Sequence, residues 1–188
     1  MAGRMSALVQ LSQEGKKVFH IKELGALWGI KNPNTLRITL NRYVHSGLLH
    51  SIYRGFYGLL PLEKMNPVDL GIKALHRFSY LSTESVLYET AWISQAPSAI
   101  TLVSELSRNF NVGKQHYRSR QLSDRYLYQT EGLLEVDGCL KASPERALVE
   151  LLYFNPKATI DKTVDWKKIS ELQKKWGYPL TPERYETA

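Results

Sequence analysis

The residues best suited to contacting another molecule lie between positions 31 and 46, where amides and cations occur without an acidic side chain. Asparagine can form two hydrogen bonds with adenine, arginine can do so with guanine, and isoleucine or threonine can contact the methyl group of thymine. The candidate DNA-contacting residues here are Lys31, Asn34, Thr35, Arg37, Ile38, Asn41, Arg42 and His45. Their types predict a surface that reads bases in a DNA groove.

Helical periodicity places these candidates on one side of a helix predicted over residues 33–46. Asn32 is a typical N-cap, Pro33 suits the first helical position because no N–H is needed there, and Gly47 ends the helix. The inward stripe of the helix consists of Leu36, Leu40, Tyr43 and Val44. The candidates occupy the opposite face and its margins. An ordinary solvated face is the alternative, although such faces more often carry Glu/Lys pairs at i,i+4.

The neighbouring elements predict a winged helix-turn-helix over residues 1–60, a fold that places one helix in a DNA groove. Its expected elements are a helix at 5–14, extended residues at 18–20, helices at 21–28 and 33–46, and strands at 48–53 and 56–60. Arg54 and Gly55 form the tip of the hairpin, where glycine tolerates a positive φ. Arg54 is expected to reach a phosphate or the minor groove. Tyr53 is chiefly a packing residue whose hydroxyl offers a second phosphate contact.

The net charge is concentrated in the same segment. Residues 1–60 contain eight Lys and Arg against two Glu, so +6 of the total of +7 lies there. The other residues carry 17 basic and 16 acidic side chains, which nearly cancel. A basic N-terminal segment followed by a nearly neutral remainder is typical of a protein that binds a polyanion, although net charge alone is weak support.

A mainly helical α+β protein is predicted, with a linker at 61–66, a mixed α/β domain at 67–180 and a loose tail at 181–188. Further helices are predicted at 67–76, 82–92, 143–155 and 165–175. Ser82 is expected to cap the second of these. Strands are predicted at 100–103, 115–122, 127–128, 133–136 and 139–140. An Asp137-Gly138 turn is expected to join the last two strands.

The second domain has one basic feature, made of His116, Arg118, Arg120 and Arg125. Alternation along a strand puts the first three on one face. They form a candidate secondary basic surface that would extend a DNA footprint or receive a phosphate-bearing partner. The plainer interpretation is a solvated edge strand blunted by charge.

No metal site, cofactor or catalytic group is predicted. The five histidines are scattered, and no H-x-x-x-H, C-x-x-C, glycine-rich phosphate loop or G-x-S-x-G pattern is present. The lone Cys139 is expected to be a small core residue. Asp165-Trp166-Lys167 matches the acid-x-Lys part of a nuclease site, but it opens a predicted helix, and chance explains it better.

The compartment expected for the chain is the bacterial cytoplasm. A single cysteine forms no internal disulfide, and Met1 is not followed by a basic-then-apolar leader. No apolar run approaches the roughly 20 residues of a membrane span, so no membrane partner is expected. The sequence does not predict the oligomeric state.

Several segments together resemble the AbiE-type abortive-infection antitoxins, which are also transcriptional regulators. The resemblance covers residues 5–155. It rests on Tyr53-Arg54-Gly55-Phe56-Tyr57, on Ser79-Tyr80-Leu81-Ser82-Thr83-Glu84-Ser85-Val86-Leu87, on the strand at 100–103, and on Ala142-Ser143-Pro144-Glu145-Arg146-Ala147-Leu148-Val149-Glu150-Leu151-Leu152-Tyr153. The last segment is the most specific of these.

The resemblance implies a repressor of its own operon that binds inverted repeats in double-stranded DNA. It also implies a C-terminal domain that neutralises a cognate nucleotidyltransferase toxin without a stable complex. The family's DNA-reading role falls on the exposed face at 33–46 and on Arg54. The chain ends soon after Leu151-Leu152-Tyr153, so a short member, or a relative kept only as a regulator, is expected.

The function predicted from the sequence is therefore a sequence-specific DNA-binding repressor that acts as antitoxin of a toxin–antitoxin operon. The alternative function is a protein-interaction module whose winged domain binds a protein partner. A metal-dependent nuclease is a third and weaker alternative, which would need Asp165 for Mg²⁺-dependent cleavage.

Overall fold

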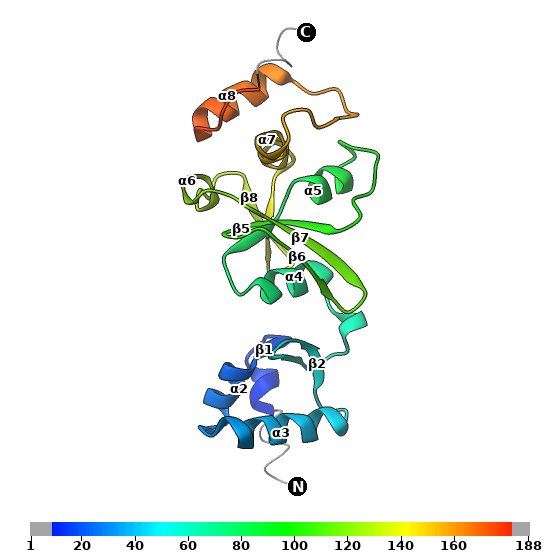
Figure 1. Cartoon of the computed structure of the whole chain (residues 1–188), viewed down its shortest axis with the longest axis vertical. Coiled ribbons are helices and arrows are strands. Elements are labelled where there is room, and N and C mark those ends of the chain that lie inside the picture. Colours follow the sequence, from blue (N-terminus) through cyan, green and yellow to red (C-terminus); the bar gives the residue numbers. More distant parts are fainter. Residues whose placement is uncertain (1–8, 182–188) are drawn as a thin grey trace. The chain divides into compact units, whose positions relative to one another are not determined.

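The computed structural model describes residues 9–181, and these residues form two compact units, the first ending at Asn66 and the second beginning at Pro67 (Figure 1). The chain is a mixed α+β protein in which each unit combines helices with its own sheet. The segment at 61–66, expected as a linker, contains a short 3-10 helix, η1 (Leu62–Lys64), and groups with the first unit. Met65 is buried there.

In its described part, the first unit combines helices with a three-stranded sheet. Residues 9–13 are helical, and the start of the helix expected at 5–14 lies outside the described residues. The elements that follow are β1 (Val18–His20), α2 (Ile21–Leu27), α3 (Pro33–His45), β2 (His50–Tyr53) and β3 (Phe56–Gly58). The sheet is antiparallel, with the strand order β1-β3-β2. The elements expected between 18 and 60 are present, with shorter strands.

Local sequence signals account for the ends of these helices. The Asn32 side chain accepts hydrogen bonds from the backbone N–H groups of Asn34 and Thr35, at 2.9 and 3.2 Å, so the predicted N-cap is confirmed. Gly47 follows α3 at φ +70°, a conformation that glycine adopts without steric cost. A buried cluster holds the unit together: Leu11, Phe19, Leu24, Leu36, Leu40, Tyr43 and Leu49.

The second unit is built on a six-stranded mixed sheet with the order β6-β7-β5-β4-β9-β8. The strands are β4 (Ser79–Leu81), β5 (Ile100–Ser104), β6 (Arg108–Val112), β7 (Gln115–Gln121), β8 (Leu133–Val136) and β9 (Cys139–Ala142). The pairs β5–β7 and β4–β9 are parallel, and the other pairs are antiparallel. The sheet is larger than expected, because β4 and β6 were not predicted.

Helices cover both faces of this sheet. Figure 1 shows α4 (Pro67–Leu75) on one side, and α5 (Glu84–Glu89) and α7 (Pro144–Phe154) on the other. Helix α8 (Trp166–Trp176) packs on α7, and the short α6 (Asp124–Leu127) follows β7. The four inward residues of α7, Ala147, Leu148, Leu151 and Leu152, are buried. The helices expected at 67–76, 143–155 and 165–175 are confirmed.

Three expectations for the second unit are wrong. Residues 127–128 are not a strand, since Leu127 ends α6 and Tyr128 is its C-cap. Ser82 does not cap a helix: α5 begins at Glu84 and ends at Glu89, short of the predicted end at residue 92. Strand β7 is not an edge strand, because it pairs with β6 on one side and with β5 on the other.

A buried ionic network explains the correction at Ser82 and also binds the backbone on both sides of residues 127–128. The Ser82 hydroxyl donates to Glu150 Oε2 at 2.5 Å instead of to a helix start. Glu150 Oε1 accepts from Tyr80 Oη at 2.6 Å and from Arg146 Nε at 2.8 Å. The Arg146 guanidinium also donates to the backbone carbonyls of Tyr126, Gln129 and Glu131, so those carbonyls need no strand partner.

The tail expected at 181–188 is described only at its first residue. Thr181 is buried, and its hydroxyl accepts a hydrogen bond from Gln173 Nε2 at 3.0 Å. Residues 182–188 lie outside the described part of the chain.

Candidate nucleic-acid interface

The exposed face of α3 carries every candidate that the sequence placed on it. Lys31, just before the helix, is exposed, as are Asn34, Thr35, Arg37, Ile38, Asn41, Arg42 and His45. Leu36, Leu40 and Tyr43 are buried on the opposite side, as predicted. Ile38 is 68% exposed, although it is a large apolar side chain in the middle of the helix. We call this set, Lys31 together with the seven helical residues, the α3 face.

The capping of α3 determines how this face can contact phosphate. A free helix N-terminus offers backbone N–H groups to an anion. Here Pro33 has no N–H, and Asn32 Oδ1 accepts from the next two residues. The Leu36 N–H donates to the Asn32 carbonyl at 3.0 Å, which starts the helical ladder. Phosphate contacts at this end must therefore come from side chains, not from the backbone.

The C-terminal end of the face is partly preorganised. His45 Nδ1 lies 2.7 Å from the backbone carbonyl oxygen of Asn41, which can only accept, so Nδ1 carries the proton in this contact. The Arg42 guanidinium lies over the Tyr43 ring at 5.9 Å. These contacts restrict two polar side chains of the face before any ligand binds.

The hairpin turn is anchored to the start of α2. The Ile21 N–H donates to the Gly55 carbonyl at 2.7 Å, and Gly55 has a φ of +77°. The ring of His20 packs edge-on against Phe56, with centroids 5.1 Å apart. Arg54 at the tip is exposed, and Tyr53 beside it is half-buried. The short turn therefore presents Arg54 from a fixed backbone.

The few acids of this unit do little to offset its charge. Glu23 belongs to a capping box: its carboxylate accepts from the His20 backbone N–H at 2.8 Å and from the Lys16 ammonium at 3.3 Å. These two hydrogen bonds, the backbone one first, hold the pKa of Glu23 below its usual value. Lys16 is thus neutralised locally, while Lys17, Lys22, Lys31, Arg37, Arg42 and Arg54 have no ion-pair partner within residues 9–181.

The secondary basic surface expected in the other unit is not one cluster. His116 and Arg118 are exposed on β7 and line a common concavity of about 530 Å³. Arg120 is ion-paired with Glu84, and its guanidinium lies over the Phe154 ring at 5.3 Å. Arg125 lies on α6, over the Tyr126 ring at 5.5 Å, and is not part of that concavity.

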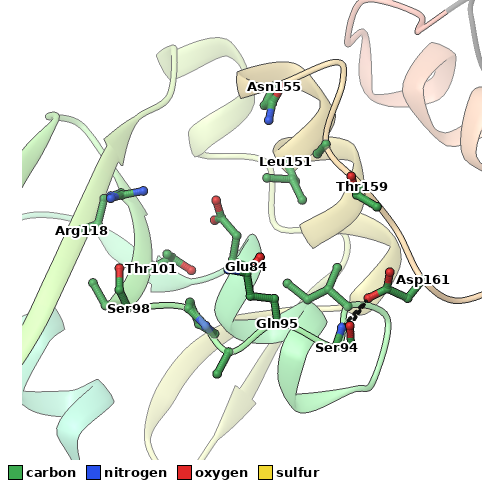
Figure 2. Close-up of a pocket in the computed structure, with 15 residues that line it drawn as sticks. Glu84, Ser94, Gln95, Ser98, Thr101, Arg118, Leu151, Asn155, Thr159 and Asp161 are labelled. Atoms are coloured by element: carbon green, nitrogen blue, oxygen red, sulfur yellow. Dashed lines mark hydrogen bonds between the residues drawn. The ribbon is translucent and has the colours of Figure 1, made fainter.

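A second cavity of about 570 Å³ lies beside Arg118 in the same unit (Figure 2). It is lined by Glu84 of α5, the loop at 93–99, the end of α7 and the loop at 158–161. Ser94 ties two of these segments together, since its N–H and hydroxyl donate to Asp161 Oδ2 at 2.5 and 2.7 Å. No pattern in the sequence indicates this cavity, because its residues come from five segments that are separate in the sequence.

Three other candidates from the sequence can be placed in the described part of the chain: a metal site, the thiol of Cys139 and the carboxylate of Asp165. No group of three or more His, Cys, Asp or Glu residues gathers there in a way that could hold a metal ion. Cys139 is buried, as expected, and burial raises the pKa of its thiol. Asp165 is the N-cap of α8, accepting from the Lys168 N–H at 3.0 Å. Among residues 9–181 no helix has the length and apolar character needed to cross a membrane.

Comparison with known proteins gives a fold relationship. No protein-family model matches the chain, and no curated protein matches it. The structure is similar to the crystal structure of the RV2827C protein from Mycobacterium tuberculosis, with a TM-score of 0.52 and 11% identity. The match covers 90% of this chain and 64% of that one, so the chain spans less than two thirds of that protein's length. At this identity the likeness concerns the fold alone.

Proposed function

We propose that the first unit is a winged helix-turn-helix that binds double-stranded DNA in a sequence-specific way. In this reading α2 and α3 are the helix pair, α3 is the recognition helix in the major groove, and the β2–β3 hairpin is the wing. The sheet order β1-β3-β2 and the anchored turn at Arg54 support the assignment. The proposal assigns base contacts to the α3 face and phosphate contacts to the cations around it.

The observation that carries the proposal is the composition of the α3 face. It combines two asparagines and two arginines with threonine and isoleucine, all exposed, on a helix without any acidic residue. Exposing an apolar side chain such as Ile38 to water is energetically unfavourable. Contact with a thymine methyl would remove this side chain from water. A solvated face would not need this set of side chains.

We extend the proposal to a transcriptional repressor that acts as antitoxin of a toxin–antitoxin operon. This part rests on the resemblance to the AbiE-type antitoxins carried by the wing and by the segment at 142–153. The repressor would bind inverted repeats in its own promoter, and the second unit would neutralise a nucleotidyltransferase toxin without a stable complex. Co-expression with a nucleotidyltransferase encoded beside it should then restore growth.

The direct experiment is a gel shift on DNA from the chain's own promoter region, with scrambled DNA as competitor. Asn41→Ala combined with Arg42→Ala should abolish the preference for the promoter, because each good bidentate base contact contributes about 1–3 kcal/mol of discrimination. Gln121→Ala combined with Arg125→Ala removes the same kinds of group from exposed positions of the second unit and should change nothing. Equal preference in the α3 double variant would exclude α3 as the recognition helix.

One observation favours the rival function, a protein-binding winged domain. A concavity of about 440 Å³ lies between α2 and α3. Its lining is largely apolar, with three cations: Ile21, Lys22, Gly25, Ala26, Ile30, Lys31, Pro33, Leu36 and Arg37. Ala26→Gln would fill part of this concavity and should abolish the binding of a partner that inserts an apolar side chain there. The substitution changes no residue of the α3 face. The DNA proposal predicts an unchanged gel shift for that variant.

A further inference from the structure

The concavity between α2 and α3 has the size and lining of a small-molecule site. Its volume of about 440 Å³ falls within the roughly 300–1,000 Å³ of such sites, which are mostly apolar with a few polar groups. Its apolar lining residues are Ile21, Gly25, Ala26, Ile30, Pro33 and Leu36. The other lining residues are Lys22, Lys31 and Arg37. We propose that this concavity binds an amphipathic carboxylate, with its apolar body on the apolar residues and its carboxylate between the cations.

Small residues on α2 create the concavity. Ile21 and Gly25, and likewise Lys22 and Ala26, are four residues apart and therefore share one face of the helix. The backbone of Gly25 approaches α3 so closely that a Cβ there would lie 3.0 Å from Leu36 Cδ2. Ala26 carries only a methyl group and is exposed. A longer side chain at Ala26 would fill part of the concavity, so the sequence itself leaves this space open.

The apolar part of the concavity is held in place by the core of the first unit. Leu36 belongs to the buried cluster of this unit, and Ile21 and Ile30 pack against that cluster. The turn after α2 is tied back to the helix, because the Ile30 N–H donates to the Gly25 carbonyl at 2.9 Å. A ligand therefore meets a preorganised apolar surface, which lowers the entropic cost of binding.

The cations of the concavity have no acidic partner to compete with a ligand. Lys22, Lys31 and Arg37 are exposed, and none of them makes an ion pair within residues 9–181. Glu23, the acid next to Lys22, accepts from the His20 N–H and the Lys16 ammonium, and it does not line the concavity. A guanidinium can bind a carboxylate through two parallel hydrogen bonds. The charge of the site therefore favours an anion.

The two kinds of lining residue together define the class of ligand. A neutral apolar molecule would cover the apolar residues and gain nothing from the cations. A small hydrophilic anion such as acetate would meet only the cations, and a DNA phosphate likewise offers no apolar body. A carboxylate with an apolar chain satisfies both requirements. Straight-chain alkanoates are therefore the probes of choice, since their chain length varies while their charge stays constant.

Two of the three cations, Lys31 and Arg37, also belong to the α3 face. A carboxylate bound between them would compete with DNA, and by linkage DNA would weaken carboxylate binding by the same factor. This competition rests on the DNA-binding function proposed above, whereas the carboxylate site itself does not. A chain that binds octanoate but not promoter DNA would refute that function and support the site.

The first experiment is isothermal titration calorimetry of the full chain with alkanoates from hexanoate to decanoate, each below its micelle concentration. The affinity should rise about 4-fold for each methylene group that is buried. Octan-1-ol, which has the same chain as octanoate without its charge, should bind about 5-fold more weakly, because exposed ion pairs contribute modestly. An affinity independent of chain length, or equal for octanoate and octan-1-ol, would overturn the proposal.

Substitutions locate the binding site. Ala26→Gln should abolish octanoate binding by occupying the concavity, with circular dichroism as the check on folding. Lys22→Gln should weaken octanoate binding up to about 5-fold and changes no residue of the α3 face. Lys17→Gln is the matched control, because it removes an exposed lysine of the same unit outside the concavity, and it should leave the affinity unchanged. Native affinity in Ala26→Gln would place octanoate elsewhere and overturn the proposal.

Methyl NMR adds a readout that needs no substitution. Ile21 and Ile30 line the concavity, so their methyl signals should shift when octanoate is added. Ile38 is an exposed isoleucine of the same unit outside the concavity, and its signal should stay in place. Shifts at Ile38 without shifts at Ile21 and Ile30 would overturn the proposal. An acidic amphipathic peptide that shifts Ile21 and Ile30 where octanoate does not would assign the concavity to a protein partner and also overturn it.

Discussion

Added salt should weaken promoter binding in proportion to the cations that the first unit presents. Six exposed cations among residues 9–60 lack an acidic partner within the described chain: Lys17, Lys22, Lys31, Arg37, Arg42 and Arg54. Each phosphate neutralised contributes about −0.9 to the slope of log K against log salt. If each of the six neutralises one phosphate, the slope is about −5 per bound chain. Between 50 and 200 mM salt the affinity then falls on the order of 10³-fold.

Single substitutions sharpen this prediction. Arg54→Ala should make the slope shallower by about 0.9 and weaken promoter and scrambled DNA alike, because a phosphate contact carries no sequence information. Arg125→Ala removes an equal charge from the second unit and should leave the slope unchanged. Fluorescence anisotropy of labelled promoter DNA, titrated from 50 to 200 mM KCl as the assay range, measures both quantities. A flat slope, or an equal change in the two variants, would refute docking through the first unit.

Two further predictions concern the second unit. Glu150→Gln should lower its unfolding free energy by about 3–5 kcal/mol in denaturant titrations, because Arg146 is left as an unpaired buried charge. A loss below about 1 kcal/mol would show that the pair is dispensable. Hydrogen bonds from the Ser94 hydroxyl and N–H hold the pKa of Asp161 below its usual value of 3.8, so this carboxylate stabilises the loop above that pH and stops doing so as pH falls through its lowered pKa. Ser94→Ala should raise that pKa in a carboxyl NMR titration, and an unchanged value would count against the contact.

The first unit could be predicted in detail because its signals are local. Asn32, Pro33 and Gly47 mark the ends of α3 within a few residues of sequence, and the 3.6-residue period separates its buried from its exposed side. The exposure of Arg42 and Ile38 followed from that period alone. The DNA ligand assigned to this face stays a prediction.

The second unit depends on contacts that are distant in sequence, and the errors occur there. Ser82 resembles an N-cap in its local context, but Glu150 lies 68 residues away and takes its hydroxyl. Strand β6 was missed because only Phe110 and Val112 are buried among its polar residues. The cavity beside Arg118 depends on the tertiary packing of loops, which no periodic pattern in the sequence indicates.

Site-specific photo-cross-linking tests the central claim most directly. A benzophenone side chain at position 38, in place of the exposed Ile38 of α3, should cross-link to promoter DNA under ultraviolet light. The same group in place of Tyr88, an exposed aromatic of the second unit, should not. Cross-linking at position 88 but not at 38, with both variants still bound to the DNA, would contradict the account.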